Sequence, residues 1–201
     1  ALLLLEKELS PQKRVPISSI EASLDLLALS VLARIPSDAD PAIKIKELNH
    51  VLFDELALRF PPQSEVEEKT QQFSELSSVL FSRRGICLGA STLYLCLAQR
   101  IGLPLSIFTP PGHIFVGYKG AAALRAIETT ARGIDVPVEE YLGTSLRSLP
   151  ERSLKEVIGM VAFNRAAIAL NKKEWEKALS TYTTASRFES DEELSLMISM
   201  T

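Results

Sequence analysis

The chain has 201 residues, of which 46% are hydrophobic and 23% are charged, and its formal net charge is −3 at pH 7. This composition is that of a folded globular protein and excludes a largely disordered chain. The acidic balance and the lack of a dense Lys/Arg stripe argue against nucleic-acid binding, and no apolar run reaches the ~18 residues needed to span a membrane. Two cysteines and two histidines exclude a disulfide scaffold and argue against a zinc finger.

The chain begins with a short apolar run, residues 1–5, which is followed by Glu6, Lys7 and Glu8. A signal peptide would have a basic leader and a cleavage site with small residues, and this run has neither. We interpret it as the first turn of a docking helix and expect a cytoplasmic location. Because the chain does not start with Met, export directed by a preceding segment stays open.

Helical periodicity dominates the first hundred residues. The predicted helices cover about 18–34, 41–60, 65–81 and 88–101. Ser18 and Glu21 have the spacing of a capping box at the start of the first helix. Asp40 and Pro41 suit the N-cap and first position of the second helix. Gly102 would close the fourth helix as a left-handed cap.

The character of the sequence changes after Pro104. Short runs of β-branched and aromatic residues at 105–108, 113–118 and 124–129 are separated by Pro-Pro-Gly and Lys-Gly-Ala. This pattern is typical of a small antiparallel sheet. Residues 138–142 would form one helical turn. A boundary at Leu149-Pro150 divides a first domain, 1–150, from a helical segment, 151–201, so the predicted fold class is α+β.

The segment 151–201 has the pattern of a helical hairpin. It resembles a tetratricopeptide repeat at Ala162, Asn164, Ala166, Trp175, Ala178, Tyr182 and Ala185. It departs from that family at Lys173, where a turn Gly is usual, and at Ser190, where Pro is common. About three repeats are usually needed for stability. We therefore expect this single repeat to pack against the preceding domain or against further repeats. The alternative is an ordinary helical hairpin.

Cys87 lies just ahead of the fourth predicted helix and follows Arg83-Arg84-Gly-Ile. The positive end of a helix favours the thiolate, which is the nucleophilic form of cysteine. Cys96 lies on the opposite side of the same helix, so it is expected to be a buried core thiol with no disulfide to Cys87. The arginine pair would bind an acidic partner, cap preceding carbonyls or pair with nearby acids.

His113 and Glu128 lie on two neighbouring predicted strands. With residues 119–122 as the loop, Tyr118 pairs with Ala123 and His113 pairs with Glu128. Opposed residues have Cβ atoms about 4.5–5.5 Å apart, so the ring and the carboxylate would meet, whereas a slip of one residue would separate them. With a cysteine, these two form a nucleophile, a base and an orienting group. The alternative is a buried thiol, an exposed histidine and a solvated glutamate.

Three stretches of the chain resemble the transglutaminase-like superfamily and, within it, the SirB-type branch. They are residues 78–104, Pro111-Gly-His-Ile-Phe-Val and Leu48-Asn-His-Val-Leu-Phe-Asp-Glu-Leu. Members of this branch combine the domain with tetratricopeptide repeats. The resemblance implies a papain-like plan, in which a helix with the nucleophilic cysteine at its start packs on a small antiparallel sheet that carries the histidine and an aspartate.

The same resemblance assigns roles to three residues of this chain. Cys87 takes the nucleophile position, His113 the base position and Glu128 the usual aspartate position. Two departures stand out. Many SirB-type members have proline where Cys87 stands, and Glu128 is one methylene longer than aspartate. The candidate oxyanion donors are the Cys87 backbone N–H and the side chain of Gln71 or Gln72.

The expected function is acyl transfer or amide hydrolysis through a thioester on Cys87. Water as acceptor would make the protein a peptidase or amidase, and an amine would make it a cross-linking enzyme. The first alternative is a non-catalytic scaffold that binds a protein or peptide partner through the repeat segment, and the second is a regulatory thiol sensor. No P-loop, dinucleotide-binding or paired-histidine metal motif is present, so we expect neither a cofactor nor a metal.

Overall fold

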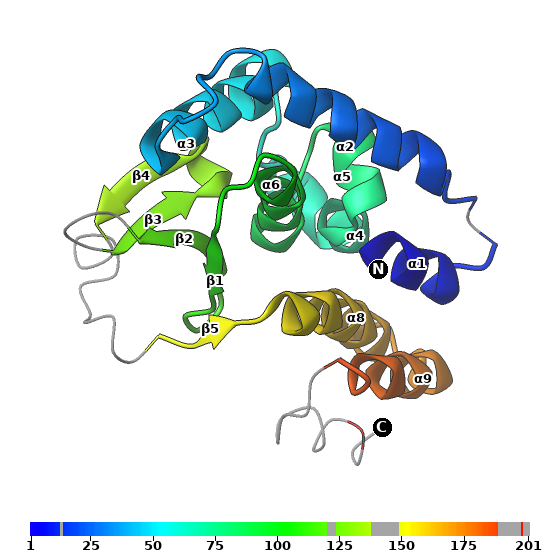
Figure 1. Ribbon diagram of the computed structural model, residues 1–201. Helices are drawn as coiled ribbons and strands as arrows, with labels where there is room; N and C mark the ends of the chain where they lie inside the picture. Colours follow the sequence, from blue (N-terminus) through cyan, green and yellow to red (C-terminus); the bar gives the residue numbers. More distant parts are fainter. Residues whose placement is uncertain (13, 120–123, 138–148, 189–197, 199–201) are drawn as a thin grey trace.

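The computed structural model describes residues 1–12, 14–119, 124–137, 149–188 and 198. In these residues, helices gather around one central helix and a five-stranded antiparallel sheet lies along one side (Figure 1). The predicted α+β class is therefore confirmed. None of the described helices has the length and apolar character needed to span a membrane. The helical turn predicted at 138–142 lies outside the described residues.

The first helices differ in how well their starts were predicted. They are α1 (Leu2–Leu9), α2 (Ile17–Leu32) and α3 (Pro41–Asn49), and η1 (His50–Glu55) continues α3 as a π-helix. Asp40 caps α3 as predicted, because its carboxylate accepts a hydrogen bond of 2.9 Å from Ile43 N. The capping box at Ser18 is wrong. Pro16 is the N-cap of α2 and Ser18 already lies inside the first turn.

One predicted helix, 65–81, is two helices in the structure. The helices that follow η1 are α4 (Gln63–Ser74), α5 (Leu76–Ser82) and α6 (Cys87–Arg100). The break falls at Glu75, whose backbone is extended and whose side chain is buried. The last of the three, α6, is central, with contacts to α2, α4, α5 and the sheet (Figure 1).

A glycine allows α4 to approach the start of α6 closely. A Cβ atom on Gly89 would lie 2.1 Å from the carbonyl oxygen of Phe73, so any other residue would push the two helices apart. That same carbonyl accepts a hydrogen bond of 3.1 Å from Ile86 N, at the N-cap of α6. The two contacts fix the position of the first turn of α6, where Cys87 lies.

The sheet has the strand order β4-β3-β2-β1-β5. Its strands are β1 (Ser106–Phe108), β2 (Phe115–Lys119), β3 (Leu124–Glu128), β4 (Ile134–Pro137) and β5 (Glu151–Arg152). The first three match the prediction, whereas β4 and β5 were not predicted. The predicted register is wrong by two residues, since Tyr118 pairs with Arg125 and not with Ala123. A shift of two keeps every side chain on its predicted face.

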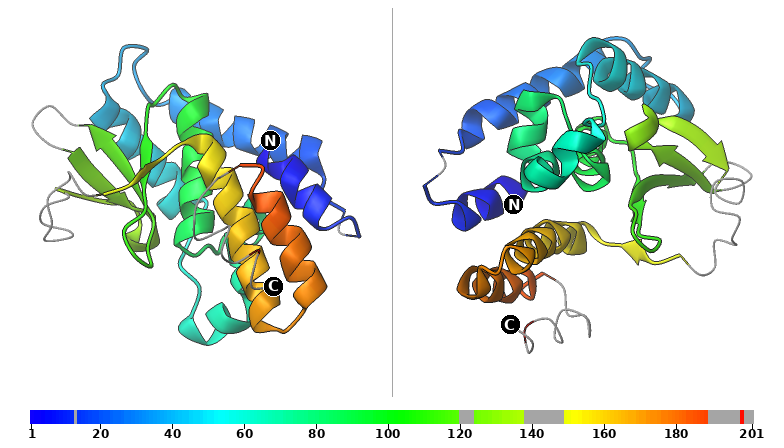
Figure 2. Two further views of the ribbon diagram at one scale, coloured as in Figure 1. Left: turned by 90° about the horizontal axis from the view of Figure 1, so that it is seen from below. Right: turned by 180° about the vertical axis from the view of Figure 1, so that it is seen from behind.

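The C-terminal hairpin consists of α8 (Leu154–Asn171) and α9 (Trp175–Ala185), which run side by side (Figure 2). Ala166, Ala178 and Tyr182 are buried, as a tetratricopeptide repeat requires, and Lys173 adopts the left-handed conformation that the family's turn Gly would take (φ 61°). Such a repeat would also bury Trp175, but this side chain is 52% exposed. The helical pair is confirmed, and the repeat assignment stays a prediction.

Buried polar contacts join the hairpin to the rest of the molecule. Arg165 of α8 is buried, lies 3.2 Å from the carboxylate of Glu75 and donates a hydrogen bond to the carbonyl of Leu9. Asn164 Nδ2 donates to Ser74 Oγ at 2.8 Å. In addition, β5 pairs with β1. The segment after residue 150 thus completes the sheet and docks on α1 and α4, and the division of the chain at residue 150 stays a prediction.

Candidate functional site

The first element of the site is the N-terminus of α6. Cys87 is the first residue of this helix, one position earlier than predicted, and its side chain is partly exposed. The N-cap residue, Ile86, has an extended backbone and provides no side-chain cap. The first amides of a helix have no partner within the helix, so their N–H groups point outward from its start. Cys87 therefore lies in the positive field of the helix end.

The second element is the pair formed by His113 and Glu128. His113 Nε2 lies 2.6 Å from Glu128 Oε2, and the histidine is 28% exposed whereas the carboxylate is only 7% exposed. His113 precedes β2, and its backbone N–H donates to Pro110 O at 3.1 Å. The structure thus brings together the histidine and the carboxylate that the sequence analysis paired, although the strand register differs.

Glu128 is held by the turn that follows β3. Its Oε1 atom accepts hydrogen bonds from Thr130 N at 2.9 Å and from Thr130 Oγ1 at 2.5 Å. Glu128 is therefore the N-cap of the short 3₁₀ helix η2 (Thr129–Ala131). With one oxygen engaged in the turn, the other oxygen of the buried carboxylate is directed to the His113 ring.

A layer of hydrogen bonds ties this turn to α6, the helix that carries Cys87. Ser91 Oγ and Thr129 Oγ1 are 2.9 Å apart. Tyr94 OH donates to Asn49 Oδ1 at 2.9 Å, and Asn49 Nδ2 donates to the carbonyl of Gly133 at the same distance. These bonds fix the turn of Glu128 relative to the helix of the nucleophile.

The residues of this supporting layer were not predicted from the sequence. One signal was available, because Asn49 lies in the stretch from Leu48 that resembles the SirB-type branch. Ser91, Tyr94 and Thr129 gave no signal, since their partners are distant in the chain and serine, threonine and tyrosine are common in ordinary helices and turns.

Cys87 lies close enough to His113 to interact with its ring. Because Nε2 is engaged by Glu128, Nδ1 is the ring nitrogen left for the thiol. Interaction with the Cys87 side chain and, next in size, acceptance of the ring N–H by the Glu128 carboxylate raise the pKa of His113 from its ordinary 6.5 to about 10, against the opposing effect of partial burial. The ring is therefore a cation at neutral pH, placed between the sulfur and a carboxylate.

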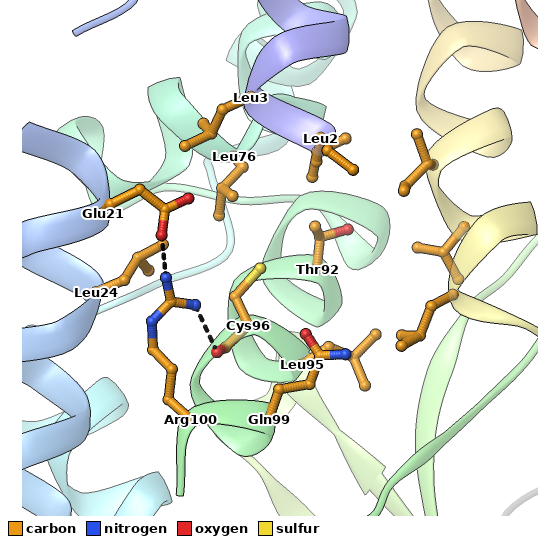
Figure 3. Close-up of a pocket in the computed structure, with 14 residues that line it drawn as sticks. Leu2, Leu3, Glu21, Leu24, Leu76, Thr92, Leu95, Cys96, Gln99 and Arg100 are labelled. Atoms are coloured by element: carbon orange, nitrogen blue, oxygen red, sulfur yellow. Dashed lines mark hydrogen bonds and ion pairs between the residues drawn. The ribbon is translucent and has the colours of Figure 1, made fainter. Parts of the chain in front are cut away.

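The other cysteine lies in a different environment. Cys96 faces a cavity of about 320 Å³ between α1, α2, α6 and α8 (Figure 3). Burial raises the pKa of its thiol to about 11. Both cysteines are free thiols. Cys96 packs against the hydrophobic core, but it is partly exposed and not fully buried as predicted.

The two glutamines considered as oxyanion donors differ from the Cys87 amide in their surroundings. Gln71 Nε2 donates to Glu75 Oε1 at 2.8 Å, within the polar cluster that docks the hairpin. Gln72 is exposed on α4. The backbone N–H of Cys87, at the start of α6, is the donor that lies next to the sulfur.

The described residues contain no group of three or more His, Cys, Asp or Glu side chains that would hold a metal ion.

A family model for the transglutaminase-like superfamily matches residues 18–145, a stretch that includes Cys87, His113 and Glu128. Searches of curated proteins and of solved structures gave no match. The family match covers well over half of the sequence, and its span contains α6, β1, β2, β3 and β4. The chain therefore belongs to the transglutaminase-like superfamily.

Proposed function

We propose that the protein is a cysteine-dependent enzyme that takes up an acyl group from an amide as a thioester on Cys87 and passes it to water or to an amine. The observation that carries this proposal is the His113–Glu128 pair, whose ring also interacts with Cys87. The three residues come from α6, the segment just before β2 and the end of β3, which are the elements of a papain-like plan. We also propose membership of the SirB-type branch.

The first step uses the proton on His113. The thiolate of Cys87 attacks the carbonyl carbon of the amide, and the tetrahedral oxyanion is stabilised by the Cys87 backbone N–H. When the C–N bond breaks, the imidazolium of His113 gives its proton to the leaving amine. The products of this step are the thioester, the free amine and a neutral ring.

The second step restores the enzyme. Neutral His113 takes a proton from the acceptor, water or a primary amine, as the acceptor attacks the thioester carbon. The C–S bond breaks and leaves the thiolate of Cys87 beside a protonated ring. Glu128 holds the ring through Nε2 in both steps and stabilises its positive charge.

The length of Glu128 agrees with the strand register. Extended from the observed pairs, the register places His113 opposite Thr130, so Glu128 reaches the ring as a diagonal neighbour. Diagonal neighbours on two strands are about 7–8 Å apart, farther than opposed ones. The extra methylene of glutamate relative to aspartate spans this separation.

A second proposal concerns the hairpin. Trp175 is 52% exposed and Leu179 is 39% exposed, and both lie on α9. Exposed aromatic and aliphatic side chains on a repeat-like helix support contact with a protein partner or with further repeats. We therefore keep a protein or peptide partner, bound by the hairpin, and a cytoplasmic location as predictions.

The experiment that tests the enzyme uses p-nitrophenyl acetate as acyl donor. We expect a burst of p-nitrophenolate and mass-spectrometric detection of acetyl-Cys87, followed by turnover that an added primary amine accelerates. The matched control is Cys96→Ala, which should keep the burst, whereas Cys87→Ala should lose it. Acetylation confined to lysines or Cys96 would refute the proposal.

A further inference from the structure

Two arginines immediately before Cys87 have no role in the site described above. Arg83 and Arg84 are both exposed, and in the described part of the chain neither guanidinium donates a hydrogen bond or forms an ion pair. The sequence from Leu76 to Arg100 contains no acidic residue. Their charges are therefore not offset by acids within this segment, and the two structural roles suggested by the sequence, capping and pairing with acids, are not what their side chains do.

The backbone around the pair is well fixed. Arg59 N donates to Arg83 O at 3.0 Å, and Gly85 N donates to Arg59 O at 3.2 Å. Only two residues lie between Arg84 and Cys87, so their Cα atoms are at most about 11 Å apart. The backbone of Arg84 is thus held within about one Debye length of the backbone of the proposed nucleophile.

A hollow borders Ser82, the residue that precedes the arginine pair in the chain. It has a volume of about 420 Å³ and is lined by Arg14, Val15, Pro16, Ser77, Ser78, Phe81 and Ser82. Phe81 is 61% exposed, and Arg14 is exposed and forms no ion pair with the described residues. The acidic residue nearest in the chain to Ser77 and Ser78 is Glu75, which is buried and paired with Arg165. We call Arg14, Arg83, Arg84 and Phe81 the basic surface.

We propose that the basic surface binds an acidic peptide segment with an apolar side chain, and that this segment carries the acyl group that Cys87 attacks. The inference rests on the proposed function and adds its substrate class. Three arginines without acidic partners match carboxylates, and the hollow beside Phe81 accepts an apolar side chain. A nucleic acid would need a longer basic footprint, whereas the whole chain carries a net charge of −3.

The test compares Arg83→Gln/Arg84→Gln with the control Lys172→Gln/Lys173→Gln. Both double variants remove two adjacent exposed positive charges, and each pair includes one residue in the left-handed conformation, with φ of 56° at Arg83 and 61° at Lys173. The change in net charge and the backbone strain are therefore matched. The control pair lies at the turn between α8 and α9.

The first readout is alkylation of Cys87 by anionic iodoacetate and by neutral iodoacetamide at low salt, followed by mass spectrometry. We expect the iodoacetate rate to fall about threefold in the arginine variant, with the iodoacetamide rate and the control unchanged. An unchanged ratio of the two rates would overturn the claim that the arginines act at Cys87. A slow iodoacetamide reaction in the wild type would count against the proposed enzyme instead, so the two failures are distinguishable.

The second readout is fluorescence anisotropy with a fluorescein-labelled peptide of alternating Glu and Phe, its Gln/Phe counterpart and a single-stranded oligonucleotide. We expect the Glu/Phe peptide to bind the wild type more tightly than the other two probes, and to lose about tenfold in affinity in the arginine variant only. Equal binding of the Gln/Phe peptide, or tighter binding of the oligonucleotide, would overturn the proposal.

Discussion

The two cysteines of α6 lie on one helix and are both partly exposed, but their neighbours differ. Cys87 begins the helix, is partly exposed and contacts a protonated His113. Cys96 lies nine residues farther on and faces a cavity where burial raises the pKa of its thiol to about 11. The same residue type thus lies beside a histidine at one end of the helix and beside a cavity that disfavours its ionised form toward the other.

The comparison of Cys87 with Cys96 indicates that the groups around a thiol determine how easily it forms the reactive thiolate. At the start of α6, the outward N–H groups and the His113 cation stabilise negative charge on sulfur. At Cys96, desolvation by α1, α2 and α8 penalises that charge, because the thiolate would lose its hydration. Substitutions that remove the His113 ring or open the cavity at Cys96 should therefore reduce the difference in reactivity between the two thiols.

The largest effect should come from His113→Ala. Without the ring, Cys87 loses its proton acceptor and its cationic neighbour, so acylation by p-nitrophenyl acetate should slow by about 10²–10⁴. The rate of the burst measures this directly. His50→Ala is the control, because His50 is exposed and lies in η1, where Asp54 is its partner at 3.1 Å. A loss smaller than threefold in His113→Ala would show that the ring is not the base.

Arg165→Ala should have the next largest effect, and this effect should appear at Cys96. It removes the buried cation that pairs with Glu75 and weakens the docking of α8, which forms one wall of the Cys96 cavity. We expect the free energy of unfolding in urea to fall by about 3 kcal/mol and Cys96 to become open to iodoacetamide.

The control for this change is Arg187→Ala, which removes an exposed arginine that pairs with Glu8. An exposed pair contributes little, so stability and Cys96 reactivity should stay as in the wild type. If Arg165→Ala behaved like this control, the docking of the hairpin would not depend on the buried pair.

A smaller effect is expected for Glu128→Gln, and it should depend on pH. The folded pKa of His113 is raised from 6.5 to about 10. A raised pKa gives stabilisation that is fully present below about pH 6.5 and is lost as pH rises through about 10. Glu128→Gln should therefore lower the free energy of unfolding by about 1–3 kcal/mol at pH 6, and by clearly less at pH 10.5. A difference that is constant between these pH values would contradict the charged pair.

The sequence predicts well where signals are local. The Asp40-Pro41 start of α3, the strands β1 to β3 and the position of Cys87 at a helix start each depend on a few neighbouring residues. The predicted meeting of His113 with Glu128 is confirmed for a different register, because a shift of two residues preserves the faces of both strands.

Features that depend on distant partners could not be predicted. The helix break at Glu75 follows from a buried ion pair with Arg165, ninety residues away in the chain. The two residues of β5 form a strand only because β1 offers an edge. The resemblance around Leu48 draws attention to Asn49, but its hydrogen bonds to Tyr94 and Gly133 are seen only in the structure.

The most direct test of the central claim is the iodoacetamide reactivity of Cys87 and Cys96 as a function of pH, mapped by mass spectrometry in the folded protein. At pH 6 a free thiol is almost wholly protonated, because its ordinary pKa is about 8.5. We predict that Cys87 reacts at pH 6 faster than free cysteine, that His113→Ala removes this reactivity, and that Cys96 stays unmodified until the protein unfolds. If Cys87 in the wild type follows the profile of free cysteine and ignores the loss of His113, the thiolate–imidazolium pair and the proposed enzyme are both contradicted.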